Sequence, residues 1–288
     1  MSLLDSVHAA GSKEDELMSI VAVSDVHLGM KGSKEKEFTD FIEYLTDRKI
    51  EHLVLLGDIL ETWRGDFNKV IIEFSATLGT LNKMLENTQI HYIAGNHDFY
   101  LFRLNGLLKN DLFPFKVEKH VVIRSKEQEF FFFHGYQLEV LCNPFYKSMK
   151  TYEAFCEHMC LAGDNAGHTA EKLWEQLLSK RSFLDSLKMF PSEPKSALMS
   201  LRQPPEMRIR NYQKYKIFRP IRELAGAETR HFLLPIHPEQ YLIYGHTHEA
   251  YVDDEKKVAN TGSWGFGEEK KCEYIEIVDD KVSLKEFN

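Results

Sequence analysis

Side chains that commonly bind metal ions follow short hydrophobic runs at several places along the chain. The set contains two aspartates, one asparagine and four histidines: Asp25, His27, Asp58, Asn96, His134, His246 and His248. One cation rarely takes so many protein ligands of this mixture, whereas two cations that share a bridging carboxylate would use them all. The sequence therefore predicts a site for two divalent cations. Imidazole favours zinc or iron, while carboxylate and amide oxygens admit manganese, which we favour here.

The local sequence around these residues suits such a site. Glycine precedes Asp58, Asn96 and His246, and a glycine lets the backbone turn sharply at a strand end and leaves room for ions. In 25–27 and 246–248, alternation along an extended segment would put both ligands of each pair on one side. A single aspartate after a strand often caps a helix, and a single histidine is more often a surface or core residue. Four such motifs, each at a strand end, favour the metal site.

The elements that must position these residues alternate between strand and helix in the first third of the chain. The runs 19–24, 52–56 and 90–94 are β-branched or aliphatic and lead into the polar motifs, whereas 38–45 and 70–85 have helical spacing. This pattern is typical of an α/β fold, in which the carboxyl ends of adjacent strands meet at one rim of the sheet. We expect the polar motifs to meet at that rim.

Further along the chain, strand patterns at 117–124 and 129–133 end at His134, and strand patterns resume from Tyr241 to Phe287. Helical periodicity fills the interval between them. We therefore predict an N-terminal tail at 1–18, a core formed by 19–142 and 233–288, and an inserted helical cap at 143–232.

The charge distribution separates this cap from the rest of the chain. The chain has a formal net charge of -8, yet the stretch from Cys142 to Leu234 has 15 Lys and Arg against 10 Asp and Glu. A basic cap on an acidic chain predicts contact with an anionic group, and the alternative is a solvated helix face. The candidate substrate-binding residues are Arg208, Arg210, Lys214 and Arg219.

Composition excludes several other classes of protein. With 43% hydrophobic and 28% charged residues, the chain is an ordinary globular protein rather than a disordered or collagenous one. We find no apolar run long enough to span a bilayer and no secretory signal, although peripheral membrane contact is compatible with the sequence. The four cysteines include no CxxC pair, which predicts a reducing, cytoplasmic setting. The sequence leaves the oligomeric state open.

Taken in order, the motifs resemble the signature of the calcineurin-like metallophosphoesterases. The matching segments are Asp25-x-His27, Gly57-Asp58, Gly95-Asn96-His97-Asp98, His134 and Gly245-His-Thr-His248, with Asn260-Thr-Gly-Ser263 similar to the turn that often follows. The resemblance implies two packed mixed β-sheets flanked by helices, with a dinuclear site at one edge. It implies one ion on Asp25, His27, Asp58 and His248, and a second on Asp58, Asn96, His134 and His246, with Asp58 bridging.

Within that family, residues 56–66 and Phe99 resemble the UDP-2,3-diacylglucosamine hydrolases, which cleave a pyrophosphate. Those enzymes usually have Arg where this chain has His97, and Asp where it has Tyr136. The resemblance makes His97 the group that stabilises developing charge or protonates the leaving oxygen. Glu61 or Asp98 would orient its ring, and we favour Glu61 slightly.

The function predicted from these features is a metal-dependent phosphoesterase in which a metal-bridging hydroxide cleaves a phosphodiester or pyrophosphate bond. Its substrate would be a small or lipid-linked molecule, including nucleotide-containing ones. One alternative is a nuclease of the same fold, against which the net charge argues. Another is a non-catalytic scaffold of this fold, against which the intact ligand set argues.

Overall fold

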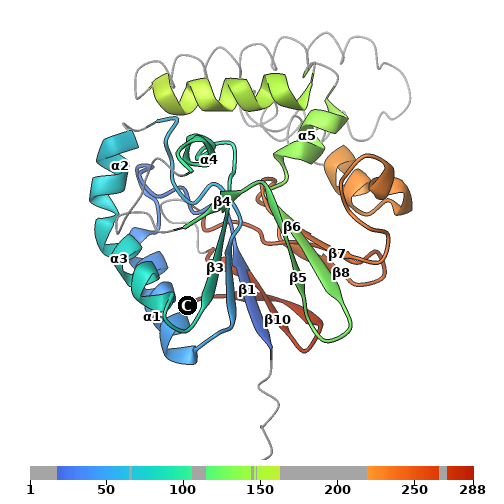
Figure 1. Ribbon diagram of the computed structural model, residues 1–288, viewed down its shortest axis with the longest axis horizontal. Helices are drawn as coiled ribbons and strands as arrows, with labels where there is room; N and C mark the ends of the chain where they lie inside the picture. The colour runs from blue at the N-terminus through green and yellow to red at the C-terminus, as the bar shows by residue number, and fades with distance from the viewer. Residues whose placement is uncertain are drawn as a thin grey trace, which may run out of the picture.

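The computed structural model describes residues 18–64, 67–105, 115–143, 146, 148–162, 219–265 and 271–288. The described strands form two mixed sheets that pack against each other, with helices on the outside (Figure 1). The first sheet has the order β11-β10-β1-β2-β3-β4: Lys281–Glu286, Glu273–Val278, Ser19–Val23, His52–Leu55, Gln89–Ile93 and Val117–Glu118. The second has the order β5-β6-β7-β9-β8: His120–Arg124, Glu129–Phe133, Tyr241–Tyr244, Val258–Asn260 and Tyr251–Asp253. This architecture confirms the predicted α/β fold class.

Each sheet contains a run of parallel strands that is completed by antiparallel pairs. β1, β2, β3 and β4 pair in parallel; β10 pairs antiparallel with β1, and β11 pairs antiparallel with β10, so that β11 runs in the same direction as β1. In the second sheet β6, β7 and β9 pair in parallel, between antiparallel β5 and β8. The carboxyl ends of β1, β2 and β3 therefore lie at one rim of the first sheet, and those of β6 and β7 at one rim of the second.

The hydrophobic core has a layer between the sheets and a layer beneath the helices. Along β1, Ile20 and Ala22 pack into the layer between the sheets, whereas Val21 and Val23 pack beneath the helices. Burial of both faces explains why this strand is a continuous apolar run instead of an alternating one.

Helices cover the outer face of the first sheet (Figure 1). α1 (Glu35–Arg48) buries Phe38, Phe41, Ile42 and Leu45, the apolar face that its spacing predicts. The single helix predicted at 70–85 is instead two helices, α2 (Phe67–Glu73) and α3 (Ser75–Met84). The interruption is local, because Phe74 N still donates to Val70 O at 3.1 Å and Leu78 N to Phe74 O at 2.9 Å.

Shorter helices lie near the rim of the sheets: α4 (Tyr100–Arg103) and α5 (Tyr136–Cys142). Residues 149–162 are helical and cross above the rim in Figure 1. Residues 219–225 are also helical, and a 3-10 helix, η1, spans Glu228–Phe232. The rest of the predicted cap, 163–218, and the predicted tail up to residue 17 lie outside the described residues.

The four cysteines are free thiols, and Cys156 and Cys160 are buried in the helical residues 149–162. In the described part of the chain, no helix has both the length and the apolar composition needed to cross a membrane.

Three glycines allow the rim loops to touch. A Cβ on Gly57 would lie 2.6 Å from Nδ1 of His134, and Gly57 itself has φ +84°. A Cβ on Gly95 would collide with the backbone nitrogen and side chain of Asp58, and one on Gly245 with Ser24. The glycines are therefore needed for close approach between loops that follow different strands.

Gly95→Ala should lower the free energy of unfolding by about 1–3 kcal/mol, because the added methyl group meets backbone that cannot rotate away. Gly79→Ala is the matched control: Gly79 is exposed within α3, and a Cβ there meets nothing within 4 Å. The control should be more stable than the parent by up to about 1 kcal/mol. Chemical denaturation measures both, and wild-type stability for Gly95→Ala would contradict the described contact between the loops.

Candidate metal centre

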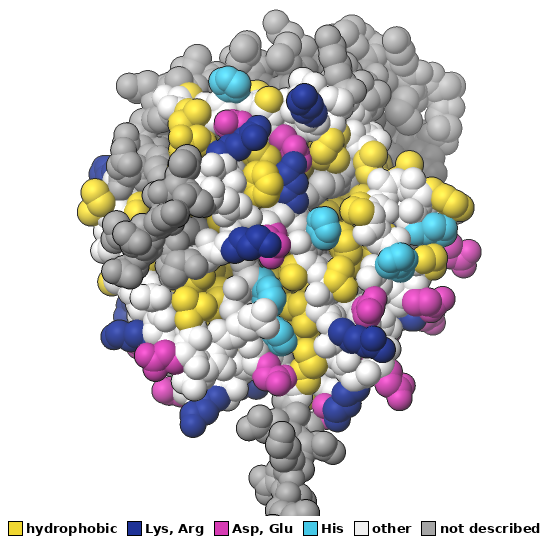
Figure 2. Space-filling view, in the orientation of Figure 1, with side chains coloured by type: hydrophobic (Ala, Val, Ile, Leu, Met, Phe, Trp, Pro, Cys, Tyr) yellow, Lys and Arg dark blue, Asp and Glu magenta, His cyan; other side chains and the backbone are white. Residues whose placement is uncertain are grey.

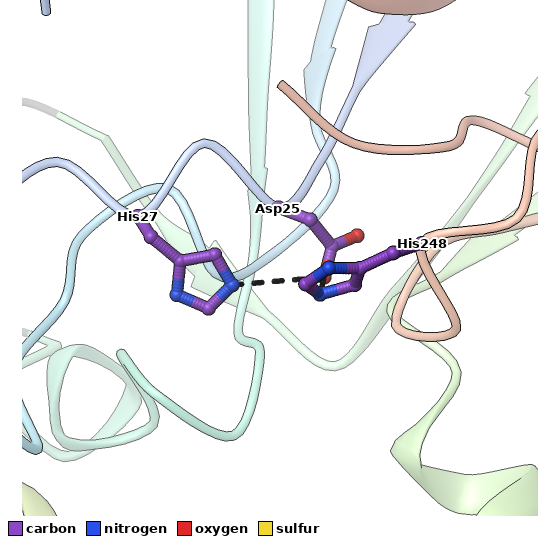
Figure 3. Close-up of side chains that lie close together, drawn as sticks. All are labelled: Asp25, His27 and His248. Carbon is purple, nitrogen blue, oxygen red and sulfur yellow. Dashed lines mark ion pairs between the residues drawn. The ribbon is translucent and has the colours of Figure 1, made fainter. Parts of the chain in front are cut away.

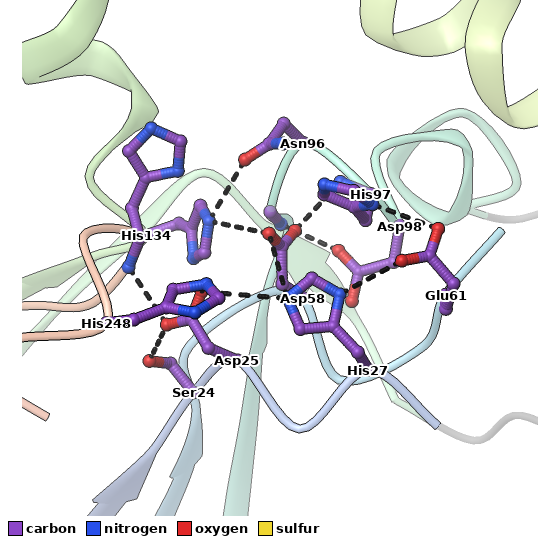
Figure 4. A network of polar contacts seen from close by, with 12 residues as sticks. Ser24, Asp25, His27, Asp58, Glu61, Asn96, His97, Asp98, His134 and His248 are labelled. Carbon is purple, nitrogen blue, oxygen red and sulfur yellow. Dashed lines mark hydrogen bonds and ion pairs between the residues drawn. The ribbon is translucent and has the colours of Figure 1, made fainter. Parts of the chain in front are cut away.

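The rim of the two sheets brings the seven predicted ligands together. All of them except His246 are labelled in Figure 4. Asp25 and His27 follow β1, Asp58 follows β2, Asn96 follows β3, His134 follows β6, and His246 and His248 follow β7. The five loops therefore come from both sheets, and segments more than 200 positions apart in the sequence meet at one place. Side chains from the two ends of the chain are neighbours here because the central strands end at this rim.

One group of potential ligands contains Asp25, His27 and His248 (Figure 3). Nε2 of His248 lies 3.1 Å from Oδ1 of Asp25, and Nε2 of His27 lies 4.0 Å from the same oxygen. One ligand atom from each of these residues lies within 4.8 Å of the others. Such a spacing suits a single cation among the three.

A second group contains Asp58, His134 and His246. Nε2 of His134 lies 3.2 Å from Oδ2 of Asp58 and 3.2 Å from Oδ1 of Asn96. Oδ2 of Asp58 also lies 4.0 Å from Nε2 of His27, which belongs to the first group. Asp58 therefore lies between the two groups, where a bridging carboxylate would have to be.

The backbone at these residues is strained. Nine non-glycine residues of the described chain have positive φ, and five of them are predicted ligands: Asp25, His27, Asp58, His246 and His248, at φ 54°, 51°, 54°, 67° and 58°. The extended conformation expected for 25–27 and 246–248 is therefore wrong, because the chain leaves each strand in left-handed turns. A strained backbone held in place by its surroundings is a feature of functional sites.

In three of the predicted histidine ligands, one ring nitrogen makes a hydrogen bond to the protein. Nδ1 of His27 is 3.1 Å from Glu61, Nδ1 of His134 is 2.8 Å from the Leu56 carbonyl, and Nε2 of His246 is 2.6 Å from Glu139. Carboxylate and carbonyl oxygens only accept hydrogen bonds, so each of these nitrogens is the donor. The other nitrogen of each ring is then the one that can bind a cation.

The buried charges of the site compensate one another. Burial raises the pKa of Asp25, but His248 and His134 outweigh it and lower the pKa to about 2. Burial also opposes ionisation of Asp58, and the surrounding histidines hold its pKa well below the usual range. Burial lowers the pKa of His134, yet Asp58 and Asp25 raise it to about 10. Ionised carboxylates with imidazoles and an amide oxygen form a donor set that fits divalent cations, which would supply the positive charge that histidine protons supply here.

His97 is held on several sides at the edge of this centre. Its backbone nitrogen donates to Asp58 at 2.8 Å, and Nδ1 lies 2.9 Å from Oε1 of Glu61. The indole ring of Trp63 stacks on the imidazole at 4.1 Å, with 24° between the planes. Burial lowers the pKa of His97, but the charges of Glu61 and Asp58 outweigh it and raise the pKa to about 9.

The structure separates the two carboxylates considered as partners of His97. Glu61 contacts the His97 ring directly and also holds His27. Asp98 instead accepts hydrogen bonds from Ile59 N at 2.9 Å, Tyr92 Oη at 2.8 Å and Gly95 N at 2.7 Å. Asp98 thus ties together the loops that follow β2 and β3, and of the two carboxylates it is Glu61 that contacts the ring.

The structure describes few of the basic residues considered for substrate binding. Arg208, Arg210 and Lys214 lie outside the described residues. Arg219 is 80% exposed and pairs with Glu223 at 2.8 Å. Two other arginines of the basic stretch have structural contacts: Arg222 lies 4.0 Å over the Tyr251 ring, and the buried Arg230 donates to four backbone carbonyls. Contact of the basic stretch with an anionic group therefore stays a prediction.

Several residues that support the centre were missed in the sequence. Oδ2 of Asp25 accepts from Ser24 Oγ and, at 2.9 Å, from His246 N, and Ser24 in turn contacts Thr261 at 2.6 Å. The polar Ser24 at the end of an apolar strand and the 260–263 turn were the available signals. Trp63 lies in the segment 56–66 that resembles the hydrolases, but nothing in the spacing of Trp63 or Glu139 links either residue to a histidine.

Comparison with known proteins identifies the family of the chain. A family model described as calcineurin-like phosphoesterase matches residues 18–250. The UDP-2,3-diacylglucosamine hydrolase of Blochmanniella pennsylvanica is 39% identical over 89 residues, which cover 29% of this chain and 34% of that protein. The enzyme of the same name from Psychromonas ingrahamii is 22% identical over 278 residues, or 93% of this chain and 96% of that protein.

Among solved structures, an archaeal phosphodiesterase aligns over 93% of this chain and 99% of its own, with a TM-score of 0.41 and 17% identity. The match to the first relative thus spans about a third of that relative's length, whereas the family model spans most of this chain. On the strength of that family match, the chain belongs to the calcineurin-like phosphoesterases.

Proposed function

We propose that the protein is a phosphoric ester hydrolase that binds two divalent cations, preferably manganese, at the rim of its sheets. The placement of Asp58 between two groups of histidines is the observation that carries this proposal. One cation would be held by Asp25, His27, Asp58 and His248, and the other by Asp58, Asn96, His134 and His246. When bound, such a pair of ions generates a nucleophile from water and neutralises the phosphoryl oxygens.

His97 is the group we assign to the leaving oxygen. Glu61 holds Nδ1 of the ring at 2.9 Å, which leaves Nε2 as the nitrogen that can donate a proton or a hydrogen bond to substrate. Stacking on Trp63 limits rotation of the ring out of that orientation. Glu61 is therefore a positioning residue for His97. Asp98 acts indirectly, because it holds together the loops that follow β2 and β3.

The substrate we propose is a phosphodiester or pyrophosphate in a small or lipid-linked molecule, as the names of the relatives suggest. Position 136 differs from the pattern of those hydrolases, and its structure shows how: Tyr136 is buried and donates to Glu153 at 3.0 Å. Because Tyr136 presents no carboxylate to the rim, the group attached to the phosphate in this protein's substrate can differ from the one in the substrates of those hydrolases.

Nucleic acid is a poorer candidate as substrate. On the face shown in Figure 2, Lys and Arg side chains are interspersed with Asp and Glu, so the described residues of that face form no continuous basic stripe. Binding a phosphate backbone without sequence preference depends on such a stripe.

Two substitutions separate metal binding from proton transfer. Asp58→Asn should lose metal, because the carboxylate common to both groups loses its charge. His97→Ala should keep two ions per chain and lose turnover by about 10²–10⁴-fold, because the ring acts on the leaving group. Metal content by elemental analysis, together with kcat on a chromogenic phosphodiester, measures both effects. Wild-type turnover of His97→Ala would remove this residue from the mechanism.

The proposed activity itself is tested with manganese-loaded protein and three kinds of substrate. A chromogenic phosphodiester and a nucleotide-linked glycolipid pyrophosphate should be hydrolysed, with little effect of added salt. Rapid cleavage of a single-stranded oligonucleotide that falls steeply with salt would indicate a nuclease instead. No hydrolysis of any of the three would favour a non-catalytic scaffold.

A further inference from the structure

Glu139 has a place in the centre that the motifs do not indicate. It lies on α5, the helix that begins two residues after His134. Its Oε2 lies 2.6 Å from Nε2 of His246, and the side chains of Glu139 and His246 are only 15% and 10% exposed. A carboxylate is rarely buried unless it is paired, so this contact accounts for its position.

The other oxygen of Glu139 is also engaged. Tyr146 donates its hydroxyl hydrogen to Oε1 at 2.9 Å. With one oxygen bound to the tyrosine and the other to the imidazole, rotation of the carboxylate would break both hydrogen bonds. Tyr146 thus fixes Glu139, and Glu139 fixes the ring of His246.

We propose that Glu139, held by Tyr146, is the positioning residue that sets the tautomer and orientation of His246 for metal binding, an inference that rests on the proposed function. Because Glu139 accepts a hydrogen from Nε2, Nδ1 of His246 keeps its lone pair for the cation shared with Asp58 and His134. A carboxylate behind a metal-binding histidine in this way both orients the ring and makes it a better ligand.

The effect of Glu139 should be confined to one of the two ions. Among the described residues, the imidazoles of the two groups use different acceptors: His27 contacts Glu61, His134 contacts the Leu56 carbonyl, and His246 contacts Glu139. Loss of Glu139 leaves the acceptors of His27 and His134 in place. The ion held by Asp25, His27 and His248 should therefore bind as before.

The same contacts connect the centre to the inserted segment. Tyr146 packs edge-on against Tyr152 with ring centroids 4.6 Å apart, and Tyr152 belongs to the helical residues 149–162. The orientation of His246 thus depends on side chains from α5 and from the segment that follows it. Through Tyr146, which holds the core residue Glu139, the predicted cap supports the metal centre and does not merely cover it.

Manganese titration of the full-length protein by calorimetry tests this role. Wild-type protein should bind two ions, and Glu139→Leu should weaken one of them by about 10–100-fold while the other changes less than about twofold. Glu139→Gln retains a neutral acceptor, so its affinity for the weakened ion should lie between those of the wild type and Glu139→Leu. A purely structural role of Glu139 would not produce this order. Tyr146→Phe should weaken the same ion by a smaller factor.

Glu153→Leu is the matched control. Glu153 is also a largely buried carboxylate that accepts from a tyrosine, Tyr136, but it contacts no predicted ligand. The Glu153→Leu variant should bind both ions with wild-type affinity. Wild-type affinity for both ions in Glu139→Leu and Glu139→Gln, or equal weakening of both ions, would overturn the role assigned to Glu139 but not the proposed dinuclear centre. Wild-type protein that binds fewer than two ions would overturn the proposed dinuclear centre as well.

As a second readout, NMR of the metal-free protein reports the tautomer of His246. The wild type should carry its hydrogen on Nε2, and Glu139→Leu should populate the other tautomer. An unchanged tautomer in that variant would also overturn the inference.

Discussion

The burial of the Asp58 carboxylate is the constraint around which the rim is organised. A buried carboxylate is costly unless it is surrounded by donors or positive charge. Here His97 N donates to Oδ1 and His134 approaches Oδ2, while Gly95 leaves the space that the carboxylate occupies. The loops after β2, β3 and β6 therefore meet at one side chain, and their mutual position is set by its requirements.

The same requirement explains the unusual backbone. To bring side chains from five strand ends to one point, the chain must leave the strands in left-handed turns, and most of the predicted ligands adopt such turns. Conformations of this kind cost roughly 1–3 kcal/mol each and persist only where surrounding contacts impose them. Ser24, Thr261 and Asp98 supply part of those contacts, since they tie the loops to one another without being candidate ligands.

The helical residues 149–162, which belong to the predicted cap, contact side chains that support the rim. Phe155 packs edge-on against Trp63, which stacks on His97, and Tyr152 packs against Tyr146, which holds Glu139. The helical residues 149–162 therefore support both the imidazole assigned to the leaving group and an imidazole assigned to metal binding. A segment that appears from the sequence to be an addition to the core is part of the structure that orients the core's functional groups.

By itself the sequence was sufficient to predict the α/β class and the seven side chains that meet at the rim. Both follow from local patterns, because polar residues directly after parallel strands lie at the rim of their sheet whatever their separation in the chain. Only the tertiary structure decided that Glu61 rather than Asp98 contacts His97, that Glu139 and Trp63 belong to the centre, and that the turns are left-handed. Those features depend on which side chains from distant segments come within a few ångströms of one another, and the spacing of residues along a chain carries no record of that distance.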